Sequence, residues 1–166
     1  MPVKILVMGL PGAGKTYFAA HLKTYLEDFS SVRTMPLNRM LTLENVPLIY
    51  SSKVDWFNAD EIRKRFNDWD FSNEGRIRQS VRMAEFAFKC SGDFVICDFV
   101  APLVEMRANF NADYTIWIDT IKESRYIDTN AVFVPPANYD FRITEQDAEK
   151  WAAVVGQHIL NLQVPV

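Results

Sequence analysis

The sequence is poor in cysteine and lacks a long apolar run. Cys90 and Cys97 are the only cysteines in 166 residues, which excludes a disulfide framework, and their spacing does not fit a zinc site. No run of about 18 apolar residues is present, so we expect no membrane span. The N-terminal residues 1–4 lead into a short apolar strand pattern rather than a signal peptide. We therefore expect a soluble, cytoplasmic protein without a membrane partner.

An excess of basic residues is missing too. The net charge is −3, so the field of the whole molecule does not attract nucleic acid, which we do not expect as a partner. Hydrophobic residues make up 49% of the chain, a content typical of folded rather than disordered proteins. A chain of 166 residues predicts a single domain, residues 1–166, around one core.

Short apolar runs alternate with segments of helical periodicity. Strands are predicted at 3–8, 54–57, 93–99 and 114–119, and helices at 15–29, 59–66, 75–89 and 144–160. Thr144 is the predicted N-cap of the last helix. Strands that alternate with helices predict an α/β fold of three layers, in which helices cover both faces of a mostly parallel sheet.

The loop after the first predicted strand fits the Walker A pattern without a substitution. It reads Gly9-Leu10-Pro11-Gly12-Ala13-Gly14-Lys15-Thr16. Glycines let successive backbone amides surround a phosphate, and the following helix adds the positive end of its dipole. The lysine of this pattern reaches the β- and γ-phosphates, and the next hydroxyl ligates Mg²⁺. We therefore expect ATP, with Mg²⁺ as cofactor, to contact Gly9, Gly12, Ala13, Gly14, Lys15, Thr16 and Tyr17.

A second cluster begins where the predicted strand 54–57 ends. Asp60 lies at the carboxyl end of that strand, and parallel sheets bind their ligands at this edge. There Asp60 is placed to orient an attacking hydroxyl or to bind Mg²⁺. The alternative is that Asp60 only caps the next helix. The basic run Arg63-Lys64-Arg65 likewise has two interpretations, an anion site and a solvated helix face.

The predicted helix 75–89 carries a third cluster. We expect it to bury one apolar face, formed by Ile77, Val81, Ala84 and Phe88. Arg76, Gln79 and Arg82 are spaced three residues apart on a stripe roughly opposite that face. Two guanidinium groups and an amide suit a charged, hydrogen-bonding acceptor, and Phe71 is placed to stack on a base. The second substrate is thus predicted to be a small, anionic, nucleotide-like acceptor.

Together these residues resemble the adenylylsulfate (APS) kinases, P-loop enzymes that phosphorylate the 3′-hydroxyl of adenosine 5′-phosphosulfate. The resemblance runs in order through residues 3–120. The matching segments are Gly9 to Thr16, Asn58-Ala59-Asp60-Glu61 with Arg63, Asp70-Phe71-Ser72, Arg76 with Gln79 and Arg82, and Phe99-Val100-Ala101-Pro102-Leu103 with Arg107. The resemblance implies a three-layer P-loop kinase fold and a role in sulfate assimilation.

The resemblance also implies site residues. The catalytic residues would be Lys15, Asp60 and Arg125, of which Arg125 is placed as a lid arginine over the transferred phosphoryl group, with a plain surface arginine as the alternative. The acceptor would be held by Arg63, Phe71, Arg76, Gln79, Arg82, Phe99 and Val100. Residues 30–53 resemble an insertion into the family pattern, placed over the site or in a subunit contact, and a homodimer is a further expectation.

The chain departs from the family pattern in the metal region. Asn58 replaces the first family aspartate, and Asp98 stands where the family has serine. We expect Asp98 to restore a carboxylate near Mg²⁺, so that Thr16, Asp60 and Asp98 form the metal region; a helix-capping role for Asp98 is the alternative. Ala101 occupies the family serine position, which excludes a phosphoserine there.

Three functions compete at this point. The first is ATP-dependent phosphorylation of adenylyl sulfate. The second is a P-loop kinase for another hydroxyl acceptor, such as a nucleotide, a modified base or a polynucleotide end, which the altered lid and Gln79 favour. The third is a non-catalytic nucleotide-binding module, for which Asp60 and the arginines would be incidental.

Overall fold

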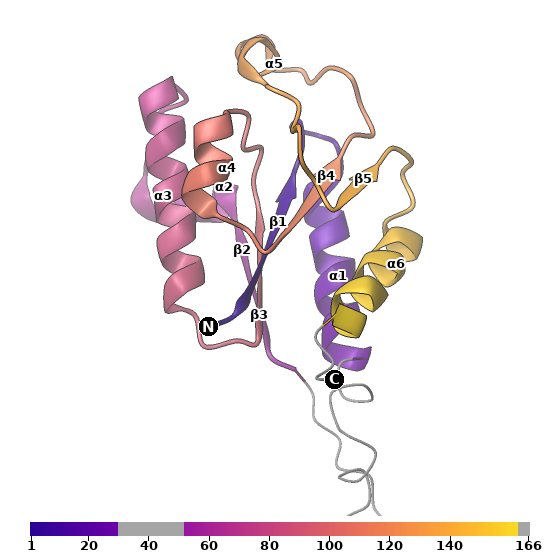
Figure 1. Ribbon diagram of the computed structural model, residues 1–166. Helices are drawn as coiled ribbons and strands as arrows, with labels where there is room; N and C mark the ends of the chain where they lie inside the picture. The colour runs from indigo at the N-terminus through magenta and orange to yellow at the C-terminus, as the bar shows by residue number, and fades with distance from the viewer. Residues whose placement is uncertain (30–51, 163–166) are drawn as a thin grey trace, which may run out of the picture.

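A sheet of five parallel strands forms the centre of the molecule in the computed structural model, which describes residues 1–29 and 52–162 (Figure 1). The strands are β1 (Val3–Met8), β2 (Val54–Asn58), β3 (Phe94–Asp98), β4 (Tyr114–Ile118) and β5 (Phe141–Ile143). Their order across the sheet is β2-β3-β1-β4-β5. All four pairings are parallel, so the carboxyl ends of all five strands lie along one edge.

Helices cover both faces of this sheet, which confirms the predicted three-layer α/β fold. The helices are α1 (Lys15–Phe29), α2 (Ala59–Phe66), α3 (Asn73–Lys89), α4 (Val104–Phe110), α5 (Ile127–Val132) and α6 (Ala148–Leu162). Helices α1 and α6 pack together on one face, and α3 packs with α4 on the other (Figure 1). Helix α5 stands above the carboxyl edge of the sheet.

Each face of the sheet has its own apolar core. In β1, Ile5 and Val7 join the cluster under α1 and α6, whereas Leu6 and Met8 join the cluster under α2, α3 and α4. Successive strand side chains point to opposite faces. Because both faces are covered, β1 is apolar in a continuous run rather than in alternation.

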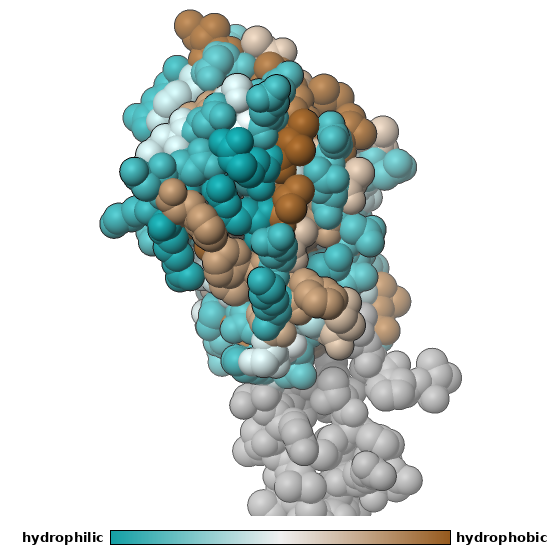
Figure 2. All heavy atoms as spheres, turned by 90° about the vertical axis from the view of Figure 1, so that its left-hand side faces the viewer, coloured by the Kyte–Doolittle hydropathy of each residue, from teal (hydrophilic) through white to brown (hydrophobic). Residues whose placement is uncertain are grey.

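The prediction for the buried face of α3 was wrong in part: Ile77 and Ala84 pack against the core, but Val81 and Phe88 do not. Helix α3 buries Gly75, Arg76, Gln79, Ser80, Met83 and Ala87. Val81 and Phe88, expected in the core, are 45% and 65% exposed. From the side of α3 and α4, Figure 2 shows apolar surface exposed among hydrophilic side chains. Two of the three polar residues proposed for the acceptor are therefore turned into the protein.

Smaller differences concern the last third of the chain. Helix α6 begins at Ala148, so Thr144 is not its cap; the carboxylate of Asp147 accepts from the amide of Lys150 instead, at 3.3 Å. Helices α4 and α5 and strand β5, of seven, six and three residues, are too short for a periodic signal and were not predicted. The segment 30–53, predicted as an insertion, lies outside the described residues except for Ser52 and Lys53.

Candidate active site

The Walker A loop connects β1 to α1 with three glycines at positive φ. Gly9, Gly12 and Gly14 have φ angles of 152°, 83° and 100°, a region that other residues enter only with strain. A Cβ on Gly9 would lie 2.3 Å from the carbonyl oxygen of Ile118, so this position also needs glycine for space. On the other side of the loop, the hydroxyl of Thr120 donates to the carbonyl oxygen of Ala13 at 2.7 Å. The loop is thus fixed to the end of β4.

Lys15 is held inside this loop. Its side chain is buried, and Nζ donates to the carbonyl oxygen of Leu10 at 3.0 Å. Burial lowers the pKa of Lys15 to about 8, although the carboxylates of Asp98 and Asp60 favour the charged form. A buried ammonium with a lowered pKa gains a strong partner when a phosphate arrives.

Asp98 is the centre of a hydrogen-bonded cluster at the ends of β2 and β3. Its Oδ2 accepts from Nε1 of Trp56 at 2.6 Å, and its Oδ1 accepts from the amide of Asn58 at 2.8 Å. The hydroxyl of Thr16 lies 3.4 Å from Oδ1 of Asp98 and 3.2 Å from Nδ2 of Asn58. Burial raises the pKa of Asp98, whereas the hydrogen bonds and Lys15 favour its charged form.

The donor set of this cluster fits Mg²⁺. A magnesium ion in a phosphotransfer site usually takes one or two protein ligands and completes its shell with phosphates and water. Thr16 and Asp98 supply one hydroxyl and one carboxylate next to each other. Within residues 1–29 and 52–162, no group of three or more His, Cys, Asp or Glu side chains could hold a metal by itself.

The capping role considered for Asp60 falls to a different residue, and Asp98 caps neither α2 nor α4, whose N-cap residue is Leu103. The side-chain oxygen of Asn58 accepts from the backbone amides of Asp60 and Glu61, at 3.0 and 3.2 Å, so Asn58 is the N-cap of α2. Asp60 belongs to the first turn of the helix and is exposed. Its carboxylate is thus left available to the cavity described next.

A cavity of about 1040 Å³ opens at the carboxyl edge of the sheet. It is lined by Pro11, Gly12, Gly14, Lys15, Thr16, Tyr17, Asn58, Ala59, Asp60, Trp69, Phe71, Arg76, Asp98, Phe99, Val100, Ile121, Glu123, Ser124, Arg125, Tyr126, Asp128 and Thr129. All three predicted catalytic residues and all three predicted metal residues lie on this wall. Of the predicted ATP contacts, Gly9 and Ala13 lie behind it and the other five line it.

The predicted acceptor residues divide into two groups. Phe71, Arg76, Phe99 and Val100 line the cavity, whereas Arg63, Gln79 and Arg82 do not. The amide of Gln79 donates to the carbonyl oxygen of Ala59 at 3.0 Å. The guanidinium of Arg63 donates to the carbonyl oxygens of Asp68 and Asp70, at 3.0 and 3.1 Å. A direct contact of these residues with an acceptor stays a prediction.

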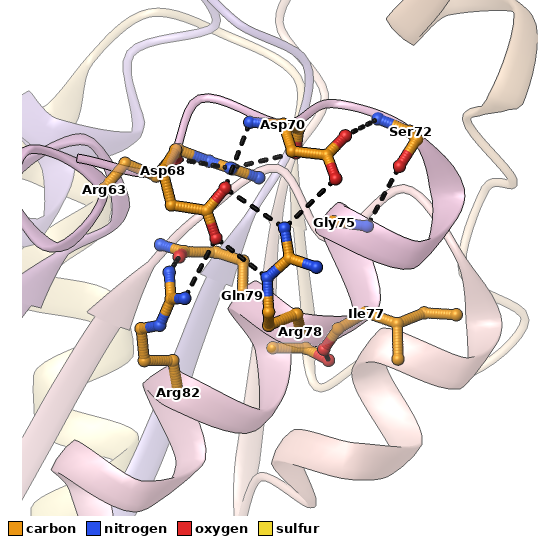
Figure 3. A network of polar contacts seen from close by, with 10 residues as sticks. Arg63, Asp68, Asp70, Ser72, Gly75, Ile77, Arg78, Gln79 and Arg82 are labelled. Carbon is orange, nitrogen blue, oxygen red and sulfur yellow. Dashed lines mark hydrogen bonds and ion pairs between the residues drawn. The ribbon is translucent and has the colours of Figure 1, made fainter. Parts of the chain in front are cut away.

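Arg82 belongs to a network centred on Asp68 (Figure 3). Its guanidinium contacts Oδ2 of Asp68 at 2.9 Å. Arg78 donates to both oxygens of Asp68, at 2.9 and 3.2 Å, and to Asp70 at 3.1 Å. These guanidinium groups hold the pKa of Asp68 well below its usual range. The network fixes the loop that carries Trp69 and Phe71 to helix α3.

Arg76 connects α3 to the segment above the cavity. Its Nε donates to the carbonyl oxygen of Phe71 at 2.8 Å, and its terminal nitrogen donates to the hydroxyl of Thr129 at 3.1 Å. The same nitrogen lies 3.4 Å from the carboxylate of Asp128. Because Asp128 and Thr129 belong to α5, Arg76 ties helix α3 to this helix across the cavity wall.

Arg125, the predicted lid arginine, lies on the exposed stretch before α5. Its guanidinium donates to the hydroxyl of Tyr126 at 2.8 Å. The stretch is braced from behind, where Asn130 and Ser124 exchange hydrogen bonds of 2.6 to 2.9 Å. Arg125 can reach the cavity from a fixed backbone, but its catalytic role stays a prediction.

Several residues of the site were missed by the sequence reasoning. Trp56 precedes Asn58 by two positions on β2, and Trp69 precedes Phe71 by two positions in the loop, so alternation next to a chosen residue could have suggested both. Asp128 and Thr129 gave no signal, because their link to Arg76 spans more than 50 residues of sequence.

In the described ranges, no helix combines the length and the apolar character needed to cross a membrane. Searches against protein-family models and against curated proteins give no match for this sequence.

Solved structures, by contrast, match over nearly the whole chain. The Mycobacterium tuberculosis APS kinase, in complex with AMPPNP and APS, is 18% identical, with a TM-score of 0.65 over 97% of this chain and 96% of that one. A sugar kinase from Janibacter sp. HTCC2649 is 13% identical, with a TM-score of 0.63 over 100% of both chains. Shikimate kinase from Acinetobacter baumannii, in complex with shikimate, is 16% identical, with a TM-score of 0.57 over 99% and 97%. The chain therefore has a P-loop kinase fold like that of the APS kinases.

Proposed function

We propose that this protein is an ATP-dependent kinase that transfers the γ-phosphoryl group to a hydroxyl of a small acceptor. The observation that carries the proposal is that Lys15 and Thr16 share one cavity with Asp60 and Arg76. A nucleotide switch needs only the first pair. A second substrate requires further groups, and Asp60 at the strand edge and Arg76 beyond it supply a carboxylate and a guanidinium.

Each group then has a role in positioning and charge stabilisation. The loop amides and Lys15 hold the β- and γ-phosphates of ATP. Asp60 orients the acceptor hydroxyl in line and accepts its proton. Arg125 stabilises the charge that spreads over the transferred phosphoryl group. Mg²⁺, held by Thr16 and Asp98, would neutralise charge on the phosphates.

Adenylyl sulfate is the acceptor that the resemblance implies. Phe71 and Phe99 line the cavity in support of it, but the contacts of Arg63 and Arg82 favour a second candidate. Both arginines are engaged by Asp68 or by backbone carbonyls of the same loop. A less anionic hydroxyl compound would need fewer free cations in the site than adenylyl sulfate does. Such a compound stays in the proposal as the alternative acceptor class.

Release of ADP from MgATP, measured with and without acceptors, tests the proposal. The panel contains adenylyl sulfate, nucleosides, nucleotides and 5′-hydroxyl oligonucleotides. We expect one acceptor class to stimulate release, and Lys15→Ala to reduce the stimulated rate by about a hundred-fold or more. Lys23→Ala, on the exposed part of α1 outside the cavity wall, is the matched control. Stimulation by no acceptor would contradict the proposal and favour a non-catalytic nucleotide-binding module.

A further inference from the structure

The cavity carries more negative than positive charge. Its cationic side chains are Lys15, Arg76 and Arg125, and its carboxylates are Asp60, Asp98, Glu123 and Asp128. In the proposed function, the phosphates of ATP take up the charge of Lys15 and Arg125. The part left for the acceptor then holds one guanidinium, that of Arg76, between two carboxylates, those of Asp60 and Asp128.

Two of the three guanidinium nitrogens of Arg76 are already engaged in this environment. Its side chain is 5% exposed, and its donors contact Phe71, Thr129 and Asp128. A phosphate or sulfate group that bound Arg76 would lie beside the carboxylate of Asp128. Because like charges at short range repel, this arrangement disfavours a dianionic acceptor.

No other arginine of the acceptor region is free within the part of the chain that the structure describes. Arg63 donates hydrogen bonds to the loop carbonyls, and Arg78 and Arg82 form ion pairs with Asp68 (Figure 3). These three guanidinium groups support the wall from behind. They do not add positive charge to its surface at the point where an anionic acceptor would need it.

The same wall presents aromatic surface. Trp69 and Phe71 line the cavity with 51% and 46% of their surface exposed. The ring of Phe71 also lies 4.4 Å from the guanidinium of Arg63 and 5.6 Å from that of Arg76, which fixes its orientation. Binding of a planar ligand over exposed aromatic rings is favourable, because it removes their apolar surface from water and allows the rings to stack.

We infer that the acceptor is an uncharged hydroxyl compound with an aromatic heterocycle, of the nucleoside class, and not a nucleotide or adenylyl sulfate. The inference rests on the proposed function. The heterocycle covers Trp69 or Phe71, and the carboxylates of Asp128 and Asp60 accept hydrogen bonds from its amino and hydroxyl groups. Asp128 is the residue that sets the charge preference, because it pairs with Arg76, the one cation that the described residues bring to the acceptor wall.

The test compares acceptors that differ in charge or in the presence of a base. Phosphoryl transfer from MgATP is measured with the four ribonucleosides, their 5′-monophosphates and adenosine 5′-phosphosulfate, and with D-ribose as the acceptor that lacks a base. We expect the best nucleoside to have a kcat/KM at least about tenfold above its monophosphate and above D-ribose. A monophosphate or adenosine 5′-phosphosulfate that exceeds every nucleoside would overturn the inference while leaving the kinase proposal intact. A kcat/KM for D-ribose equal to that for the nucleosides would overturn the inference that the acceptor carries an aromatic heterocycle. Transfer to none of the acceptors would contradict the kinase proposal itself, and the inference would fall with it.

A charge variant adds a second readout. Asp128→Asn keeps Thr129 as a partner of Arg76 and should raise kcat/KM for the monophosphates about fivefold or more, relative to the nucleosides. An unfolding midpoint and a Kd of MgATP close to those of the wild type would show that the variant is folded. Glu74→Gln, an exposed carboxylate in the first turn of α3 outside the cavity wall, should leave the ratio unchanged. An unchanged ratio in Asp128→Asn would remove Asp128 as the determinant of charge preference.

Discussion

The indole Nε1 of Trp56 donates a hydrogen bond of 2.6 Å to Oδ2 of Asp98. The two residues lie on neighbouring strands, β2 and β3, and the amide of Asn58 holds the other carboxylate oxygen. The carboxylate is therefore fixed on both sides, with Oδ1 turned toward Thr16. Trp56 does not line the cavity, so it acts as a positioning residue for the proposed magnesium ligand.

Replacement of this indole should loosen the metal ligand. Trp56→Phe removes the donor, raises the pKa of the buried Asp98 further and lowers the free energy of unfolding by about 1 to 3 kcal/mol, the scale for a hydrogen bond to a charged group. We expect the Mg²⁺ concentration at half-maximal rate to rise severalfold. Urea unfolding and a Mg²⁺ titration of the phosphotransfer rate measure the two effects.

Trp151→Phe provides the control for this variant. Its indole donates to Glu145 at 2.8 Å, which is also an indole–carboxylate bond, but neither residue lines the cavity. The Mg²⁺ requirement should not change in Trp151→Phe. An equal shift in both variants would mean that Trp56 acts only through overall stability.

The P-loop and the sheet could be predicted because their signals are local. Glycine spacing, a lysine and a hydroxyl specify the loop from eight adjacent residues, and continuous apolar runs specify strands covered on both faces. The order of the strands and the meeting of Asp98 with Thr16, 82 residues apart, follow from the parallel crossovers rather than from any single segment.

Helix α3 shows why the remainder could not be predicted. Its apolar spacing favoured Val81 and Phe88 as part of the buried face, yet both are exposed, and Arg76 and Gln79 are buried. A buried polar side chain is stable only with partners, and those of Arg76 come from a loop and from α5, far along the chain. Residue types alone do not indicate such partners, so periodicity pointed in part to the wrong face.

Asp60 should be essential for chemistry and dispensable for ATP binding. Asp60→Asn removes the carboxylate proposed to orient the acceptor hydroxyl, and we expect kcat to fall by about a hundred-fold or more with little change in the Kd of MgATP. The neighbour Glu61 is exposed in the same helical turn but does not line the cavity. Glu61→Gln should therefore keep its activity, and equal losses in both variants would refute the role of Asp60. Stopped-assay rates and calorimetric ATP titrations give the two quantities.

The affinity for MgATP should fall as the pH rises above about 8. The pKa of Lys15 in the free protein is lowered to about 8 by burial, and the phosphates bind the ammonium form. Below that pH the proton is already present; above it, binding must take up a proton, at a cost that approaches tenfold in Kd per pH unit. Calorimetry at about pH 8.5 in two buffers of different ionisation enthalpy should show proton uptake.

Replacing Lys15 by a residue that stays charged should remove the pH dependence of MgATP binding. Lys15→Arg should bind MgATP more weakly, with a Kd that does not change with pH in the same range, because arginine keeps its proton. A wild-type Kd that is constant across the range, without proton uptake, would show that Lys15 is not the titrating group.

Asp68 should control the acceptor wall without touching the acceptor. Its carboxylate joins Arg78 and Arg82 of α3 to the loop that carries Trp69 and Phe71, so Asp68→Asn should raise the KM of the acceptor severalfold and leave the KM of ATP unchanged. Hydrogen bonds from Arg78 and Arg82 hold the pKa of Asp68 in the folded protein well below the usual value for a carboxylate. Its contribution to stability is therefore present above that value and is lost as the pH falls below it. The difference in stability between wild type and Asp68→Asn should accordingly shrink in acid.

Glu145→Gln separates this role from that of an ordinary surface ion pair. Glu145 contacts Lys150 at 2.8 Å, with about half of each side chain exposed, and it lies outside the cavity wall. Exposed pairs of this kind contribute little, so neither KM should move in Glu145→Gln. Acid unfolding curves and steady-state rates of the wild type and the two variants make the comparison. If Asp68→Asn raises the KM of ATP as much as that of the acceptor, the loop does not belong to the acceptor side, and the division of the cavity into two substrate halves is wrong.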